Sequence, residues 1–94
     1  QLTYFIAVVE HASFSQAARA LTVTQPALSR QVRLLEVELR QNLLLRNGRG
    51  VRCTEAGEMM ARHARLILQN AAAAQSDMDN LRGVLRGHVT MAIP

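Results

Sequence analysis

Residues 13–33 read SFSQAARALTVTQPALSRQVR, and this stretch determines the fold that we predict. Ser13 and Gln16 have the spacing of a capping box, which satisfies free backbone groups at the start of a helix. Apolar residues then recur at helical spacing, so this helix is expected to bury Phe14, Ala17, Ala18 and Leu21. The small alanines on this face would allow a neighbouring helix to cross closely.

A second helix is predicted after a turn at Thr22 and Val23, with Val23 as the buried residue of the turn. Thr24 can cap this helix, and Pro26 suits its first turn because a missing N–H costs nothing there. The buried face is expected to be Leu28, Val32, Leu35 and Leu39. Two helices joined by so short a turn predict a helix-turn-helix.

The outer face of this second helix begins with Gln25, Ser29, Arg30 and Arg33. In the major groove of DNA, glutamine pairs best with adenine and arginine with guanine. Glu36 and Glu38 follow on the outside, where phosphates would repel them. We therefore expect a recognition helix of which only the N-terminal half enters a groove.

Residues 42–53, NLLLRNGRGVRC, predict a β-hairpin. Two short apolar runs, 43–45 and 51–53, flank an Asn-Gly step, which is a strong hairpin signal. Arg49 lies at the tip between two glycines, with Arg46 and Arg52 at the base. An arginine on such a tip suits insertion into a narrow minor groove, where the negative potential is enhanced. The alternative is an ordinary solvated turn.

A long helix is predicted over residues 55–86, with Thr54 as its cap and Glu55 and Glu58 in its first turn. Apolar residues follow heptad spacing in a seam made of Met60, Ala64, Ile67, Ala71, Ala74, Met78, Leu81 and Leu85. Such a helix would extend roughly 48 Å, too far to bury its seam against the preceding residues. We therefore expect a homodimer; the alternative is a core helix of a larger protein.

The predicted fold is mainly α-helical and has three regions. A winged helix-turn-helix, with a first helix over residues 2–10 and a two-stranded wing, takes up residues 1–53 and binds DNA. A linker or dimerisation helix takes up residues 54–86. Residues 87–94 are apolar and β-branched between Gly87 and Pro94, so they are expected to be a strand that opens a further domain missing from this chain.

Basic residues are concentrated in the first region. Residues 1–53 contain seven arginines and three glutamates, whereas the charges of residues 54–94 balance. This asymmetry is expected for a domain with a polyanionic partner. The chain has no lysine, and arginine favours bidentate contacts with phosphate and guanine, although a GC-rich genome would produce the same bias.

Other classes of protein fit less well. There is no apolar run of about 18 residues and no signal-peptide pattern, so we expect a cytoplasmic, nucleoid-associated protein without a membrane span. Cys53 has no disulfide partner and is expected to face inward as a small hydrophobe, with redox sensing as the alternative. His11, His63 and His88 lack metal-ligand spacing and a neighbouring nucleophile, so we expect no catalysis, metal or cofactor.

Together these motifs resemble the N-terminal region of LysR-type transcriptional regulators. The resemblance runs through YFIAVVEHASFSQAARAL, VTQPALSRQVRLLEVEL and RNGRGVRCTEAGE, and then along the long helix to LRGVLRGHVTMAIP. It implies sequence-specific binding of double-stranded DNA at an interrupted palindrome. By position, it implies that Gln25, Pro26, Ser29 and Arg30 face the major groove, that Arg49 reaches the minor groove, and that Thr24 and Arg33 contact the DNA backbone. It also implies a dimerising linker helix, commonly a tetramer in the intact protein, and a missing C-terminal domain that binds a small-molecule effector.

Two positions depart from the family pattern. Arg40 stands where the family usually has glycine after the recognition helix, so another cap is expected, with Asn42 as the candidate. Leu44 stands where the family usually has phenylalanine before the wing, which makes a smaller plug and leaves the angle of the wing open.

Two other functions are compatible with parts of the sequence. A nonspecific DNA-coating architectural protein would need only basic charge and dimerisation, but the uncharged Gln25 and Ser29 would add little to its phosphate affinity. A pure dimerisation module would not bind DNA at all. Competition by unrelated duplex DNA separates the first function from specific recognition, and a gel shift tests the second.

Overall fold

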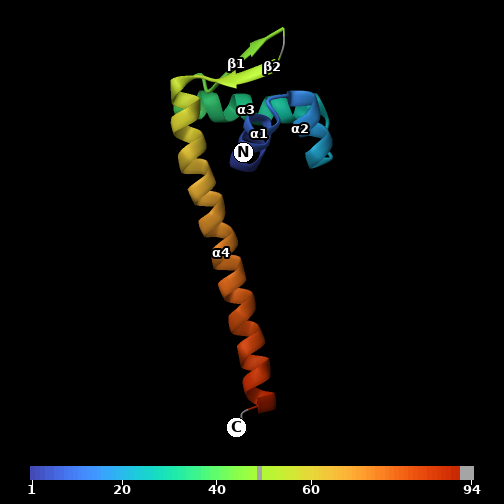
Figure 1. The fold of residues 1–94 in the computed structure, drawn as a ribbon, viewed down its shortest axis with the longest axis vertical. Coiled ribbons are helices and arrows are strands. Elements are labelled where there is room, and N and C mark those ends of the chain that lie inside the picture. The colour runs from blue at the N-terminus through green and yellow to red at the C-terminus, as the bar shows by residue number, and fades with distance from the viewer. Residues whose placement is uncertain (49, 92–94) are drawn as a thin grey trace.

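A computed structural model describes the backbone of residues 1–48 and 50–91, and their side chains up to Gly83. The elements are α1 (Leu2–His11), α2 (Phe14–Leu21), α3 (Gln25–Leu39), β1 (Leu44–Asn47), β2 (Gly50–Cys53) and α4 (Glu55–Met91). The first three helices and the hairpin gather at one end of α4, which extends away from them over a molecule of 64 × 25 × 20 Å (Figure 1). This is the predicted winged helix-turn-helix followed by a long helix.

The starts of α2 and α3 follow from local capping. Ser13 Oγ accepts a hydrogen bond from the backbone N–H of Gln16 at 3.1 Å. Thr24 Oγ1 accepts one from the N–H of Ala27 at 3.2 Å. Both predicted caps are therefore confirmed, and each satisfies a backbone donor that the first turn of a helix leaves without a partner.

The core consists of two apolar clusters that share α1. The first cluster joins α1 to the end of α3, the start of the wing and α4, through Phe5, Ile6, Leu35, Leu43, Ala61 and Ala64. The second joins α1 to the helix-turn-helix, through Val8, Phe14, Ala17, Ala18, Leu28 and Val32. Val23 packs against the second cluster, as predicted for the turn. Leu39 was predicted to be buried but is 40% exposed, because the last turn of α3 extends past both clusters.

The end of α3 corrects the prediction that Asn42 caps it. Arg40 itself takes the left-handed conformation, with a φ of 56°. The Arg40 N–H donates to the Val37 carbonyl, and the Gln41 N–H donates to the Glu36 carbonyl. The backbone therefore closes this helix without a side-chain cap. An L-residue in this conformation costs roughly 1–2 kcal/mol, which explains why glycine suits the position.

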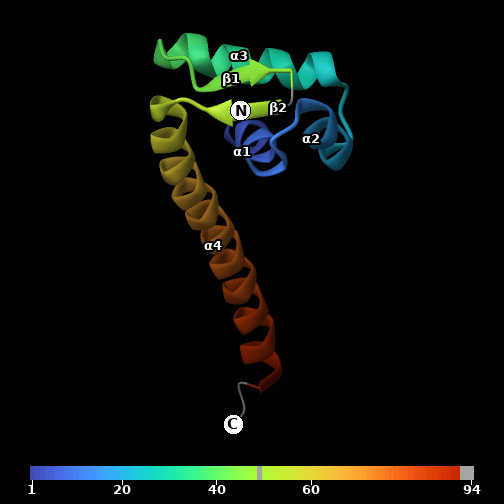
Figure 2. The same cartoon turned by 45° about the horizontal axis from the view of Figure 1, so that its top comes forward.

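The wing is an antiparallel pair in which Leu44 lies opposite Cys53 and Arg46 lies opposite Val51. Leu44 and Val51 turn toward the core and pack against the second cluster. The Val51 N–H donates to the Ala12 carbonyl at 3.3 Å, which attaches β2 to the corner between α1 and α2. In both views the hairpin lies at the end of the molecule opposite the free end of α4 (Figures 1 and 2).

Leu43 is the point at which α3, the wing and α4 meet. Its side chain is 1% exposed, and its carbonyl accepts the Thr54 N–H at 3.0 Å. Thr54 Oγ1 accepts the Gly57 N–H at 3.0 Å, so Thr54 caps α4 as predicted. A Cβ on Gly57 would collide with the Leu43 carbonyl oxygen and would lie 2.9 Å from its carbonyl carbon. The motif Thr-x-x-Gly therefore allows α4 to begin directly against the Leu43 backbone.

The end of α4 corrects a second prediction. The helix continues to Met91, past Gly83 and Gly87, where the sequence was expected to leave the helix and form a strand over residues 88–94. The glycines lower helix propensity but do not stop a helix that is already propagating. Residues 92–94 lie outside the described part of the chain, and the start of a further domain at residue 87 stays a prediction.

We predict that Gly57→Ala destabilises the protein by about 2 kcal/mol or more, because the new methyl group meets backbone that cannot move without breaking the Leu43–Thr54 contact. Gly83→Ala is the matched control on the same helix, since a Cβ at Gly83 meets nothing within 4 Å. It should be stabilising by roughly 0.5–1 kcal/mol. Denaturant unfolding of the two variants measures both effects, and equal stabilities would contradict the close approach at Gly57.

Candidate nucleic-acid interface

The exposed face of α3 carries the predicted recognition residues at its N-terminal end. Gln25, Pro26, Arg30 and Arg33 are exposed, whereas Leu28 and Val32 on the opposite face are buried. The first turn of α3 contains no acidic residue that would repel a polyanion. Amide and guanidinium groups therefore project from one side of a helix whose other side is fixed in the core.

The arginines of this region are not neutralised within the protein. Among the residues that the structure describes, the ion pair that forms is Arg82 with Asp79, far along α4. Arg19, Arg30 and Arg33 of the helix-turn-helix are exposed and form none. Their positive charge remains available to a polyanion, which would release counterions on binding.

Ser29 and Thr24 are already engaged inside the protein. Ser29 is half-buried, and its Oγ accepts a hydrogen bond of 2.7 Å from Nη2 of Arg46 on β1. The Thr24 oxygen is occupied by the N–H of Ala27 at the start of α3. Both hydroxyl groups keep their own hydrogen for a contact outside the chain.

Arg46 joins three elements around this face. Its guanidinium carbon lies 3.8 Å from the centre of the Phe14 ring of α2, while Nη2 reaches Ser29 of α3. The sequence predicts Arg46 only at the base of the hairpin. The signal was present in strand periodicity, because Arg46 alternates with Leu45 and shares the inward face with Leu44. On this face, the exposed Arg46 side chain is within reach of the Phe14 ring and the Ser29 hydroxyl.

Glu36 lies in a different place from the prediction. It was expected on the outer face of α3, but its Oε2 accepts the N–H of Leu43 at 2.8 Å and that of Leu44 at 3.2 Å. The side chain folds toward the start of β1 because these two N–H groups would otherwise lack a partner at a partly buried position. Glu38 is exposed, as predicted.

The wing tip is described only in part. Gly48 and Gly50 flank the tip, and Gly50 has a φ of 141°, which an L-residue rarely adopts. A Cβ on Gly50 would also lie 3.0 Å from the Ala12 carbonyl oxygen. Arg49, the predicted minor-groove residue, lies outside the described residues, so its role stays a prediction.

The predicted seam of α4 divides into two parts. Ala64 is fully buried and Met60 partly buried against the core of the same chain. Beyond them the seam is open: Ile67 is 48% exposed, Met78 57% and Leu81 52%, and Ala71 and Ala74 are exposed. The side chain of Leu85 lies outside the described part. Met59 and Leu66, which the heptad pattern omitted, widen this open stripe.

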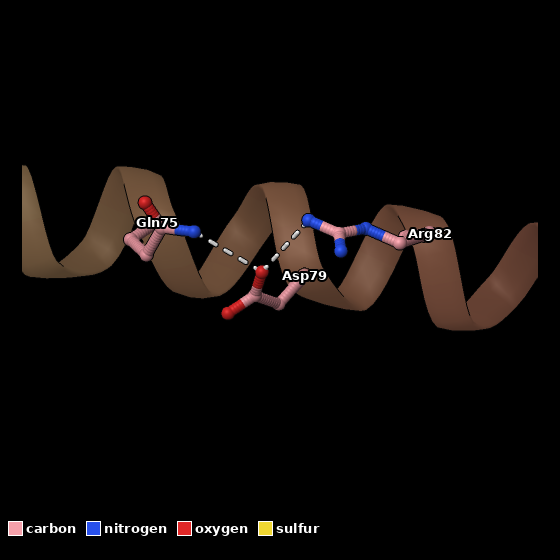
Figure 3. A network of polar contacts seen from close by, with 3 residues as sticks. All are labelled: Gln75, Asp79 and Arg82. Carbon is pink, nitrogen blue, oxygen red and sulfur yellow. Dashed lines mark hydrogen bonds and ion pairs between the residues drawn. The ribbon is translucent and has the colours of Figure 1, made fainter.

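A different face of α4 changes from apolar to polar along the helix. Gly57, Ala61, Ala64 and Leu68 pack toward the helix-turn-helix. The same line of positions continues into Gln75, Asp79 and Arg82, which form a network on the helix surface (Figure 3). Gln75 Nε2 donates to Asp79 Oδ1 at 3.1 Å, and Arg82 Nη2 reaches the same oxygen at 3.3 Å. This face is therefore suited to solvent once α4 has passed the globular end.

Cys53 lies half-buried at the base of the wing. Burial raises the pKa of its thiol, the Glu58 carboxylate raises it further, and Arg65 lowers it. A raised pKa keeps the group as a thiol at neutral pH, and the thiol is the less reactive form.

Two kinds of feature are absent from the residues that the structure describes. No cluster of His, Cys, Asp or Glu there could hold a metal ion. The described helices contain no stretch that is long and apolar enough to cross a membrane.

The family model described as "Bacterial regulatory helix-turn-helix protein, lysR family" matches residues 1–58, which contain α1 to α3, the wing and the first turn of α4. The chain belongs to the LysR family. It is similar to the nitrogen assimilation regulatory protein nac of Klebsiella aerogenes, with 45% identity over 99% of this chain and 30% of that protein. It is also 40% identical, over 99% of this chain and 31% of the relative, to the RuBisCO operon transcriptional regulator of Allochromatium vinosum.

Solved structures of the family share this fold. The BenM DNA-binding domain in complex with catB site 1 DNA superposes with a TM-score of 0.83 and 41% identity, covering 86% of this chain and 90% of that one. A complex of the CbnR DNA-binding domain with DNA gives a TM-score of 0.82 and 39% identity, covering 87% and 94% of the two chains. The chain thus corresponds to the helix-turn-helix DNA-binding domain of a LysR-type regulator, and it spans about a third of the length of these curated relatives.

Proposed function

We propose that this LysR-family domain binds double-stranded DNA in a sequence-specific way, with the N-terminal half of α3 in the major groove. The supporting observation is the exposed face of α3, where Gln25 is exposed and Arg30 and Arg33 form no ion pair with any described residue, while the opposite face is fixed in the core. Glutamine and arginine read adenine and guanine through paired hydrogen bonds. Pro26 and Ser29 complete the surface toward the DNA bases, and Thr24 and Arg33 contact the sugar-phosphate backbone of the DNA.

The wing is proposed to contact the adjacent minor groove through Arg49. The hairpin packs against the corner between α1 and α2 through the hydrogen bond from Val51 to Ala12, so its base has a defined position beside α3. An arginine at the tip of this hairpin would reach the strong negative potential of a narrow minor groove. The net charge of +4 in this half of the chain, from seven arginines and three glutamates, supports the same partner.

The domain is proposed to act as a homodimer through the open stripe of α4. The stripe consists of Ile67, Ala71, Ala74, Met78 and Leu81, and it stays apolar after the neighbouring face has become polar at Gln75 and Asp79. A helix that extends beyond its own core is marginal in water without packing along an apolar face. A second copy presents the same stripe, which suits an interface of twofold symmetry and hence an interrupted palindrome in the DNA.

The remaining parts of the proposal rest on the family resemblance. They are a C-terminal domain that binds a small-molecule effector, assembly of the intact protein as a tetramer, and a place in the cytoplasm at the nucleoid. The curated relatives extend well beyond the region that this chain matches, which leaves room for such a domain.

Selection from random duplex DNA at about 150 mM salt tests the function directly. We expect enrichment of an interrupted palindrome, because two recognition helices related by twofold symmetry read two half-sites. Enrichment of a single half-site would support specific recognition but would contradict binding as a dimer. Binding without any enriched sequence would instead indicate a nonspecific DNA-coating protein.

Replacing Arg30 tests the recognition face. Arg30→Ala should cost about 1–3 kcal/mol on the selected site and relax the preference at one base pair. Arg19→Ala, in the last turn of α2, removes the same charge from another exposed arginine and is the control. It should weaken specific and unrelated duplexes by similar, small factors. An equal loss on both duplexes for Arg30→Ala would count against base recognition by this residue.

Charge placed on the α4 stripe should break the dimer. Ile67→Glu together with Met78→Glu removes two large apolar contacts, each worth about 1.5–3 kcal/mol when buried, so dimer affinity should fall at least about 100-fold. Gln69→Glu with Asn80→Glu adds the same charge to exposed positions on another side of α4 and should change affinity little. Sedimentation equilibrium measures both pairs. Unchanged association of the first pair would mean that the stripe is not the interface.

A further inference from the structure

We propose that Arg46 is a positioning residue that holds the Ser29 hydroxyl as a hydrogen-bond donor toward an acceptor atom on DNA. This inference rests on the proposed function, and it adds which partner donates and which accepts in one hydrogen bond between the recognition helix and DNA. The acceptor belongs either to a base edge in the major groove or to a backbone phosphate. Both sources share the same chemistry, and the experiment below separates them.

The contacts of Arg46 bring three elements together at the exposed side of the domain. The residue extends from β1, its guanidinium stacks over the Phe14 ring at 3.8 Å, and its Nη2 reaches Ser29 Oγ at 2.7 Å. Phe14 is only 7% exposed, so the ring is a rigid support within the core of the helix-turn-helix. A planar guanidinium on such a ring keeps its donors in a fixed orientation, which a flexible ammonium would not.

The hydrogen bond sets the chemistry of Ser29. A serine hydroxyl has one hydrogen to donate and two lone pairs to accept, whereas a guanidinium can only donate. Arg46 therefore occupies a lone pair of Ser29, and the hydroxyl hydrogen is left to point elsewhere. The adjacent positive charge also disfavours a second donor near this oxygen. Ser29 is thus suited to purine N7, guanine O6, thymine O4 or a phosphate oxygen, and unsuited to the amino groups of adenine and cytosine.

The position of Ser29 on α3 places its donating hydroxyl near the proposed DNA-binding face. Ser29 lies one turn after Gln25 and next to Arg30, both exposed on the recognition face. A hollow between the start of α2, the start of α3 and the wing is lined by Ser15, Gln25 and Arg46. The free edge of the guanidinium therefore lies beside the recognition face, at the junction of α3 and the wing.

A double-mutant cycle in DNA affinity tests the coupling. Its variants are Ser29→Ala, Arg46→Met and the double variant, measured on the duplex obtained by selection and on its single base-pair changes. Methionine keeps an apolar stem on the Phe14 ring, so the fold is preserved while the donor and the charge are lost. Arg52→Ala is the matched control, because Arg52 lies opposite Leu45 on the other face of the wing.

We expect Ser29→Ala to weaken binding about tenfold in the natural background and less than about twofold when Arg46 is methionine, a coupling typical of residues in contact. With Arg52→Ala, the effect of Ser29→Ala should stay about tenfold. If the acceptor is on a base, Ser29→Ala and Arg46→Met relax the preference at the same base pair. If it is a phosphate oxygen, both weaken all duplexes alike and the coupling remains.

Additive effects of the two substitutions would overturn the proposal, and so would equal coupling of Ser29 to Arg52. Thermal unfolding of Arg46→Met tests whether the variant is folded. The coupling between Ser29 and Arg46 in DNA affinity would be absent if Arg46 had only a structural role. Failure of the unmodified protein to bind any duplex would contradict the proposed function itself. That result appears before any variant is compared, so the two failures are distinguishable.

Discussion

The contact between the first turn of α4 and the Leu43 backbone determines how the rest of the domain is arranged. The Leu43 carbonyl accepts the Thr54 N–H, its N–H donates to Glu36, and the missing side chain of Gly57 lets α4 start against it. One buried residue thus connects the recognition helix, the wing and α4. The direction of α4 relative to α3 follows from this junction, and the distance between two recognition faces in a dimer would follow from it as well.

The long helix then serves two purposes with two faces. Its first turns complete the core through Ala61 and Ala64, whose small side chains allow close packing. Past the globular end, the face that packed on the core becomes the polar network of Gln75, Asp79 and Arg82, while the neighbouring stripe stays apolar. The stability of the monomer therefore depends on the first part of α4, and the exposed stripe is the surface that we propose for association.

The proposed recognition face is connected to the wing by contacts within the protein itself. Arg46 stacks on Phe14 and holds Ser29, so one residue connects a strand with Ser29 on the face that we propose for DNA recognition. The neighbouring Arg30 and Arg33 form no ion pair with any residue that the structure describes. A surface that is ordered in this way loses less conformational entropy on binding, and its unpaired charges favour a polyanion.

Local sequence patterns were enough to predict α1 to α3, the hairpin, the start of α4 and the exposed N-terminal part of α3, because caps, helical periodicity and the Asn-Gly turn act between residues a few positions apart. Ser13, Thr24 and Thr54 cap their helices as predicted. The long side chains that fold back depend on tertiary contacts: Glu36 reaches the start of β1, and Arg46 reaches Phe14 and Ser29. The tertiary structure also decided that Ala64 is covered by its own chain and that Leu39 is left open. These outcomes depend on which elements meet in space, and that information is absent from spacing along a single helix or strand.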